Sequence, residues 1–401
     1  MEKQDNVRTR YAETVPYLLH WYDFNRRILP WREDPTPYHV WVSEIMLQQT
    51  RVEAVKSYYD RFLTCLPDVP ALADAGEEEL LKLWEGLGYY NRVRNMQKAA
   101  RVLVERYGGR MPADYEEIRA LPGIGDYTAG AIASIAFGLP YPAVDGNVLR
   151  VMSRITGSEE DIAKERTKKK MKEDLTAVMP ERSGDFNQSL MELGATVCLP
   201  NGKPLCEQCP VMHMCEAFQE GRETELPVKS GKKERRIEKR TVYLIGCGEK
   251  ILLHRREKKG LLAGLWEFPN VLTEQQMPEG MVTETEVLRE KLASTVPAGT
   301  RLTVKKGKKA KHIFSHIEWH MEGVCIQAEP VRAGTPDRGA EDREKLAERL
   351  SAFAEELTGK QKAPEDAVFA TVSELKETYA VPSAFEAYVK EVIKEEELEE
   401  V

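Results

Sequence analysis

The sequence lacks a long apolar run. Of its 401 residues, 42% are apolar and 31% are charged, and no stretch approaches the roughly 18 consecutive apolar residues of a membrane helix. The first ten residues are polar, so we also expect no secretory signal and a chain that remains in the cytoplasm. No internal repeat is visible, and a chain of this length is expected to form two domains.

The sequence also lacks an excess of positive charge: 66 acidic residues outnumber 58 basic ones, and the formal net charge of −8 argues by itself against a nucleic-acid partner. The average hides a pattern. Residues 229–330 hold 20 basic and 13 acidic residues (+7), whereas residues 331–401 hold 10 and 18 (−8). One dense basic run contains Lys305, Lys306, Lys308, Lys309 and Lys311. This run is either a solvated face or a phosphate-tracking patch, and the sequence leaves both interpretations open.

Cysteine is scarce and unevenly placed. Four of the seven cysteines lie in one short stretch, with intervening segments of seven, two and five residues: Cys198, Cys206, Cys209 and Cys215. In a compartment that keeps thiols reduced, such clustering indicates metal ligation rather than disulfides. Four thiolates this close can bind a tetrahedral zinc ion or a cubane iron-sulfur cluster, and the spacing does not decide between them.

Strand-like alternation is almost absent before residue 226, where apolar residues recur at helical spacing. A charged linker follows at 227–239, and Thr241–Cys247 and Ile251–Arg255 then form a predicted hairpin. Further predicted strands are His312–Ile317, Gly323–Ala328 and Ala367–Val372, and Gly339–Leu357 is a predicted helix. We therefore expect a multidomain chain, with an all-α domain at 1–226 and an α+β domain at 240–390 that carries a helical insertion at 332–364 and ends in an acidic tail at 391–401.

A glycine-rich turn, Leu121 to Gly125, precedes a helix of small residues. Gly123 and Gly125 would let the backbone turn tightly and bring its N–H groups toward an anion such as a phosphate. Alone, this pattern is also typical of an ordinary turn between helices. About twenty residues later, Asp145 precedes another predicted helix, where it could cap the helix and be held ionised.

The pairing of this turn with Asp145 resembles the helix-hairpin-helix DNA glycosylase superfamily, whose members carry an essential aspartate downstream of the hairpin. Lyases of this superfamily place a lysine two residues after the hairpin glycine, where this chain has Tyr127. The resemblance therefore implies base removal by water, which leaves an abasic site.

A second segment, Tyr38–Arg51, is predicted to be helical and contains Glu44. A glutamate beside apolar and amide groups would have its ionised form disfavoured, so it could carry a proton near neutral pH; taken alone, a helical glutamate is more often solvated. Together with Leu29, Pro30, Trp31 and Arg32, this segment resembles the adenine-specific branch of the superfamily, which acts on adenine paired with 8-oxoguanine or guanine.

This resemblance implies a role for each matching residue. Glu44 would be the general acid and Asp145 the stabiliser of the sugar cation, with Tyr127 and Asn147 beside them. The residues matching the pocket for the flipped adenine are Arg27, Trp31, Leu47 and Glu192. The residues matching the wedge into the duplex are Gln49, Thr50, Leu87 and Tyr89. Ordinary core packing is the weaker alternative for Trp31, Leu87 and Tyr89.

The resemblance extends to the cysteines and to the second domain. It implies a [4Fe-4S] cluster, although the family's first gap usually has six residues rather than seven. Gly260–Pro269 and His312–His316 match a domain similar to Nudix hydrolases, but Glu274–Glu290 lacks their magnesium-binding pattern. We therefore expect a recognition domain in which Phe314, Ser315 and His316 contact 8-oxoguanine; by themselves His312 and His316 would suit a strand surface.

Two rival hypotheses remain at this point. One is an endonuclease III-like glycosylase and lyase, which Tyr127 disfavours. The other is a DNA-binding module with an iron-sulfur cluster and no catalysis. The expected partner is double-stranded DNA with an A:8-oxoguanine or A:G mispair, bound by a bacterial-type, nucleoid-associated monomer. Whether a replication clamp or a mismatch-repair protein also docks stays open.

Overall fold

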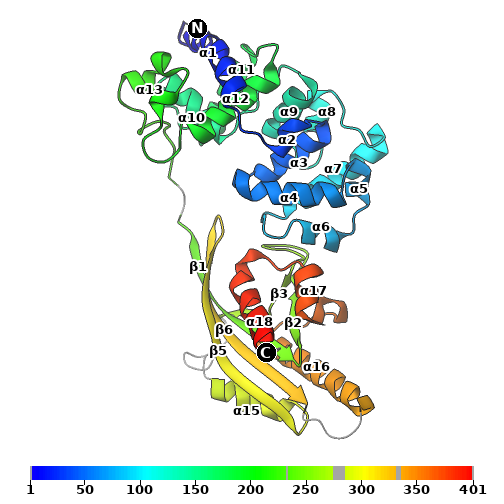
Figure 1. The fold of residues 1–401 in the computed structure, drawn as a ribbon. Coiled ribbons are helices and arrows are strands. Elements are labelled where there is room, and N and C mark those ends of the chain that lie inside the picture. The colour runs from blue at the N-terminus through cyan, green and yellow to red at the C-terminus, as the bar shows by residue number, and fades with distance from the viewer. Residues whose placement is uncertain (1, 232–233, 274–284, 331–335, 400–401) are drawn as a thin grey trace. The chain divides into compact units, whose positions relative to one another are not determined.

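The computed structural model describes the chain except for residues 1, 232–233, 274–284, 331–335 and 400–401 (Figure 1). Contacts divide the chain into two compact units. The helical unit comprises Met1–Ala75 and Asn91–Lys232, and the mixed unit comprises Gly76–Tyr90 and Lys233–Val401. Among the described helices, none is both long and apolar enough to cross a membrane.

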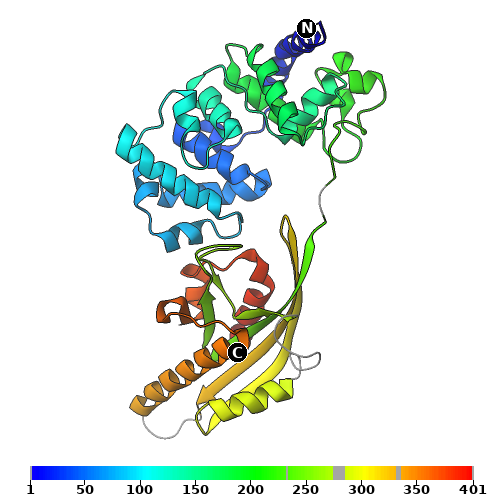
Figure 2. The same ribbon diagram turned by 180° about the vertical axis from the view of Figure 1, so that it is seen from behind.

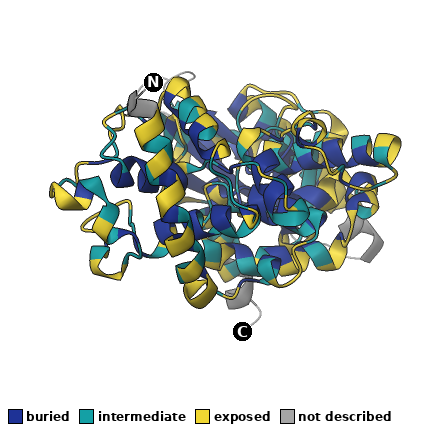
Figure 3. Ribbon diagram, turned by 90° about the horizontal axis from the view of Figure 1, so that it is seen from above, coloured by how far each residue is buried: buried dark blue, intermediate teal, exposed yellow. Residues whose placement is uncertain are grey.

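The helical unit has short connections and amphipathic helices, whose buried and exposed residues alternate (Figure 3). Its α-helices are α1 (Glu2–Asn25), α2 (Pro30–Glu33), α3 (Pro37–Leu47), α4 (Val52–Cys65), α5 (Val69–Asp74), α7 (Asn91–Tyr107), α8 (Tyr115–Arg119), α9 (Asp126–Ala131), α10 (Gly146–Ile155), α11 (Glu165–Thr176), α12 (Ser183–Thr196) and α13 (Glu216–Gln219). The π-helical turn η1 (Ile132–Ala136) continues α9, and the 3-10 turns η2 (Cys206–Gln208) and η3 (Met212–Met214) lie in the cysteine loop. Leu18, Met152, Phe186 and Leu190 belong to a core shared by α1, α10 and α12.

The mixed unit is built on a seven-stranded sheet in the order β3-β2-β1-β6-β5, with β4 paired to β1 and β7 paired to β2. The strands are β1 (Arg236–Cys247), β2 (Lys250–Arg255), β3 (Trp266–Glu267), β4 (Asn270–Leu272), β5 (Thr300–Ile313), β6 (Ile317–Pro330) and β7 (Ala367–Ala370). Only the β1–β6 pairing among these described strands is parallel.

Helices cover both faces of this sheet (Figures 1 and 2). The helices α15 (Thr285–Thr295) and α16 (Pro336–Thr358) pack on the face that carries Tyr243, Ile245 and Val324. The opposite face carries Leu244 and Trp319 and is covered by η5 (Ser383–Phe385) and α18 (Glu386–Glu399). The helices α6 (Glu77–Leu83) and α17 (Val372–Glu377) and the turn η4 (Pro364–Asp366) complete the unit.

The position of α6 differs from the contiguous division expected from the sequence. Lys82 Nζ donates to the carbonyl oxygens of Leu375 and Tyr379, each at 3.1 Å, and Glu85 accepts from the Val381 N–H at 2.7 Å. These polar contacts group Gly76–Tyr90 with the mixed unit. The two residues of each contact lie nearly 300 positions apart in the sequence, so hydrophobic periodicity cannot predict these contacts.

The prediction of one strand at His312–Ile317 is wrong. The segment contains the end of β5, a tight turn and the start of β6, and the Phe314 N–H donates to the Ile317 carbonyl at 2.8 Å. The linker is also shorter than predicted, because β1 begins at Arg236 and pairs with β6 from Ile317 onward. The hairpin of β1 and β2 and the inserted helix α16 agree with the prediction. Of the segment without a magnesium pattern, residues 274–284 lie outside the described part of the chain.

Candidate active site

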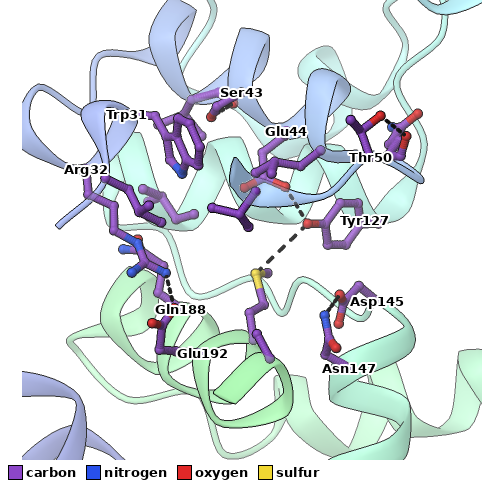
Figure 4. Close-up of a pocket in the computed structure, with 18 of the residues that line it drawn as sticks. Trp31, Arg32, Ser43, Glu44, Thr50, Tyr127, Asp145, Asn147, Gln188 and Glu192 are labelled. Atoms are coloured by element: carbon purple, nitrogen blue, oxygen red, sulfur yellow. Dashed lines mark hydrogen bonds and ion pairs between the residues drawn. The ribbon is translucent and has the colours of Figure 1, made fainter. Parts of the chain in front are cut away.

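A pocket of about 550 Å³ opens in the helical unit between α2, α3, the start of α10 and α12 (Figure 4). It is lined by residues far apart in the sequence. Those singled out from the sequence are Arg27, Trp31, Glu44, Leu47, Gln49, Thr50, Tyr127, Asp145, Asn147 and Glu192. The volume lies within the range of about 300–1,000 Å³ that is usual for small-molecule sites.

Glu44 lies on α3 and is buried, with 6% of its surface exposed. Burial, which removes the hydration of the carboxylate, and the nearby charge of Asp145 together raise the pKa of Glu44 to about 7, although the charge of Arg32 acts in the opposite direction. The Tyr127 hydroxyl donates to Oε2 of Glu44 and opposes this rise. Because the described chain places no salt-bridge partner on Glu44, the carboxyl can hold a proton near neutral pH.

Asp145 is the N-cap of α10, as the sequence predicts. Its Oδ1 accepts from the Val148 N–H at 2.8 Å, and its Oδ2 accepts from Nδ2 of Asn147 at 2.7 Å (Figure 4). Burial raises the pKa of Asp145, and these two donors oppose that rise. The expectation that capping alone sets the charge therefore omitted a burial penalty that the pocket imposes.

Glu192 is buried but differs from Glu44 in its partners. Arg27 donates to it through Nε at 2.6 Å and Nη2 at 3.0 Å, and Arg32 donates through Nη2 at 2.8 Å. Burial opposes ionisation, but the bonds from Arg27 and the charge of Arg32 hold the pKa of Glu192 below its usual value. The pocket thus contains a paired, ionised carboxylate in addition to the unpaired Glu44.

The turn after α3 corrects one detail of the prediction. The helix ends at Leu47 rather than at Arg51, and Gln49 has a φ of 61°. Arg92 accounts for this ending, because its guanidinium donates to the carbonyls of Ile45 at 2.5 Å and Gln48 at 2.8 Å. The turn leaves Gln49 exposed at the mouth of the pocket, whereas Trp31 is buried and packs edge-to-face on Tyr59.

The glycine turn connects α8 and α9, as predicted. Gly123 has a φ of +78°, and a Cβ at this position would lie 2.6 Å from Cβ of Asn95. A side chain is therefore excluded on both grounds. Gly125 is the N-cap of α9 and has open space around it.

The four clustered cysteines line one cavity together with Arg154. Burial raises the pKa of Cys209 to about 12 and that of Cys215 to about 11, so their thiolates would need the positive charge of a bound metal. Among the described residues, no three His, Cys, Asp or Glu side chains are grouped closely enough to hold a single metal ion.

Sequence reasoning missed Arg150, which connects the cysteine loop to Asp145 through Asn147. Its Nε donates to the Cys198 carbonyl at 2.9 Å, and its Nη2 donates to Oδ1 of Asn147 at 2.9 Å. Asn147 in turn donates to Asp145. The only available signal was the spacing of Asn147 and Arg150, which places them on one face of α10. Arg32, Gln188 and Met191 also line the pocket and received no role.

The remaining predicted residues lie in the mixed unit and do not line this pocket. Leu87 is buried, whereas Tyr89 is 48% exposed and has a φ of 46°. Ser315 and His316 are exposed in the turn between β5 and β6. Phe314 packs edge-to-face on His312 and Trp319 and is half-buried.

Comparison with known proteins assigns the chain to a family. Residues 42–177 match the HhH-GPD superfamily of base excision DNA repair proteins, and residues 240–391 match a NUDIX domain. Adenine DNA glycosylase of Rattus norvegicus is 40% identical over 355 residues, which cover 75% of this chain and 68% of the relative. The Homo sapiens enzyme is 38% identical and the match covers 80% and 68%; that of Buchnera aphidicola subsp. Schizaphis graminum is 31% identical, with 77% and 86% covered. The chain therefore belongs to the adenine DNA glycosylase family of base excision repair enzymes, which hydrolyse N-glycosidic bonds.

Proposed function

We propose that this enzyme removes adenine mispaired with 8-oxoguanine, or with guanine, from duplex DNA and leaves an abasic site. The observation that carries the proposal is the buried Glu44, which has no salt-bridge partner in the described chain and a pKa of about 7, in the same pocket as Asp145. Two carboxyl groups in environments this different suit an acid and a charge stabiliser.

The proposed reaction begins with a proton transfer from Glu44 to a ring nitrogen of the flipped adenine. The glycosidic C–N bond then breaks, and its electron pair leaves with the protonated base. Asp145 stabilises the positive charge that develops on the sugar, as a fixed carboxylate can do in a site shielded from water. Water adds to the sugar carbon, and the proton that it releases restores Glu44. Because Tyr127 occupies the position of the lyase lysine, no Schiff base forms and the strand stays intact.

Recognition would be divided between the pocket and the mixed unit. Arg27, Trp31, Leu47 and Glu192 would receive the adenine, since all four line the pocket. The duplex would be opened by Gln49, Thr50, Leu87 and Tyr89, of which Gln49 and Tyr89 are the exposed members. Phe314, Ser315 and His316 would contact 8-oxoguanine, and the exposure of the last two in a tight turn supports this role.

We also propose that the four clustered cysteines hold a [4Fe-4S] cluster. The support is their common cavity and the burial of Cys209 and Cys215. When bound, the cluster would fix the loop between α12 and α13 by ligation. Arg150 donates hydrogen bonds to the Cys198 carbonyl and to Asn147, so a fixed cysteine loop would also help to hold Asn147 and Asp145 in position.

Single-turnover cleavage of duplexes with one A:8-oxoguanine or A:G pair, with and without alkali, tests the proposal. Wild type should yield strand breaks only after alkali, and faster with 8-oxoguanine. Glu44→Gln should lower the rate by about 10²–10⁴. The matched control is Glu53→Gln, because the Glu53 carboxylate is 76% exposed on α4. Breaks without alkali would instead favour the lyase, and no abasic product from cluster-loaded protein would favour the binding module.

A further inference from the structure

A groove of about 500 Å³ lies on the sheet of the mixed unit, on the strands that lead to the turn carrying Ser315. Three lysines line it: Lys239 from β1, and Lys309 and Lys311 from β5. Arg240 borders the groove, but its guanidinium packs over the Trp319 ring. We call this the cationic groove. We propose that it binds the phosphodiester backbone of the DNA duplex, beside the base pair that the β5–β6 turn contacts. This inference rests on the proposed function.

One face of the sheet changes from apolar to charged along its length. Under α15 and α16 this face is apolar and carries Tyr243, Ile245, Val324 and Ile326. Side chains two residues apart in a strand share a face. The same face therefore continues as Thr241 and Lys239 on β1 and as Glu322 and His320 on β6, and strand pairing adds Lys309 and Lys311 from β5.

The cationic end of the face extends past α15 and α16, as both views of the ribbon show (Figures 1 and 2). The side chains of Lys309 and Lys311 are 80% and 54% exposed. A register shift between Lys306 and Lys309 lies where the apolar part ends. Such a bulge places one extra residue in β5 and re-aims the residues that follow, so that Lys309 and Lys311 lie opposite Glu322 and His320.

The charges in the groove are held by weak surface pairs. Lys309 Nζ lies 2.6 Å from Glu322, and Lys311 Nζ lies 2.5 Å from Glu318, which also contacts His320 at 2.7 Å. Both lysine side chains are largely exposed, and ion pairs at such positions are weak because water screens them. A phosphate can therefore compete for the lysines, while the carboxylates hold them in place before DNA arrives. Arg240 is tied to Glu238 at 2.9 Å and is less available.

The spacing of the lysines suits a nucleic-acid backbone. Lys309 and Lys311 are two strand residues apart, or about 6.8 Å, which is twice the rise of about 3.4 Å per nucleotide in B-DNA. Ser315 follows Lys311 by four residues, so the turn lies within about 14 Å of the lysines on the same strand pair. The continuity of the groove with this turn favours DNA over an acidic protein segment as the occupant.

The test is the salt dependence of DNA binding by the full-length chain. We would compare Lys309→Gln/Lys311→Gln with the control Arg301→Gln/Lys345→Gln, which removes two exposed cations paired to Glu329 and Glu341 elsewhere on the mixed unit. All proteins would carry Glu44→Gln, so that an A:8-oxoguanine duplex remains intact during the measurement. The slopes would also be measured on a fully paired duplex without a mispair, so that failure of the catalytic proposal leaves the binding measurement interpretable.

Each lysine that contacts a phosphate should contribute about one unit to the slope of the logarithm of the DNA association constant against the logarithm of the salt concentration. We therefore expect this slope to be shallower by about two units in the groove variant and unchanged in the control. Equal slopes in the groove variant and the control would overturn the proposal. A second outcome would also overturn the proposal: fluorescent polyglutamate binds the control but not the groove variant, while the salt slope of DNA binding is the same in both. That result would identify an acidic protein segment as the occupant. Circular dichroism would verify that both variants fold.

Discussion

The two units bury glutamates in opposite ways. In the mixed unit, Glu267 is 5% exposed and pairs with Arg256, and it also accepts from Nδ2 of Asn270 at 2.7 Å. In the helical unit, Glu44 is equally buried, but among the described residues it forms no salt bridge and accepts a hydrogen bond from the Tyr127 hydroxyl, and its pKa rises to about 7. Burial alone therefore does not decide how a glutamate is used. The charge of Arg32 acts on Glu44 without forming a salt bridge to it, whereas the pair at Glu267 serves the fold.

The largest expected effect breaks the pair in the mixed unit. Arg256→Met would leave the buried Glu267 without its cation and should lower the stability of this unit by about 3–5 kcal/mol. Hydrogen exchange of the β2 and β3 amides measures this locally. Adding Glu267→Gln should recover much of the loss, since no buried charge remains. A loss as small as that of Lys345→Met, at an exposed pair on α16, would contradict the comparison.

The next effect concerns Asp145, which shares the pocket with Glu44. Asp145→Asn keeps an N-cap side chain but removes the charge, so adenine release should slow by about 10²–10³ while the helix stays capped. The control is Asp114→Asn, because Asp114 caps α8 in the same manner on the surface. Equal rates for the two variants in single-turnover cleavage would remove Asp145 from the mechanism.

A third effect links Glu44 to stability. Folding raises the pKa of Glu44 from 4.5 to about 7, so the folded state binds this proton more tightly than the unfolded state. The resulting contribution to the free energy of unfolding is fully present below pH 4.5 and is lost as the pH rises through about 7. Glu44→Gln has no such loss. The variant should therefore gain stability relative to wild type by up to about 3 kcal/mol between about pH 5 and pH 8. Urea unfolding at both pH values checks this, and a constant difference would argue against a buried, unpaired carboxyl.

The smallest effect concerns Tyr127, which favours the ionised form of Glu44 through its hydroxyl. Tyr127→Phe keeps the ring and removes this bond, so the pKa of Glu44 should rise further. The alkaline limb of the pH–rate profile should then move to higher pH. A shift to lower pH would show that the hydroxyl instead stabilises the protonated acid.

Local signals account for what could be predicted from the sequence. Asp145 before a helix and Glu44 on an apolar helix are patterns within a few residues, and the structure brings both to one pocket. The turn at Phe314, Ser315 and His316 was missed because it has no Gly, Pro, Asn or Asp to mark it. The grouping of α6 with the mixed unit and the bridge through Arg150 depend on polar contacts between residues far apart in the chain. Such contacts leave no periodic pattern in the sequence.

The most direct test of the central claim is the pH dependence of single-turnover adenine release from an A:8-oxoguanine duplex. If protonated Glu44 is the acid, the rate should fall tenfold per pH unit above an apparent pKa near 7, and this limb should be absent in the residual activity of Glu44→Gln. A profile that is flat from about pH 6 to 9, or a limb that persists in Glu44→Gln, would contradict the assignment of Glu44 as the proton donor.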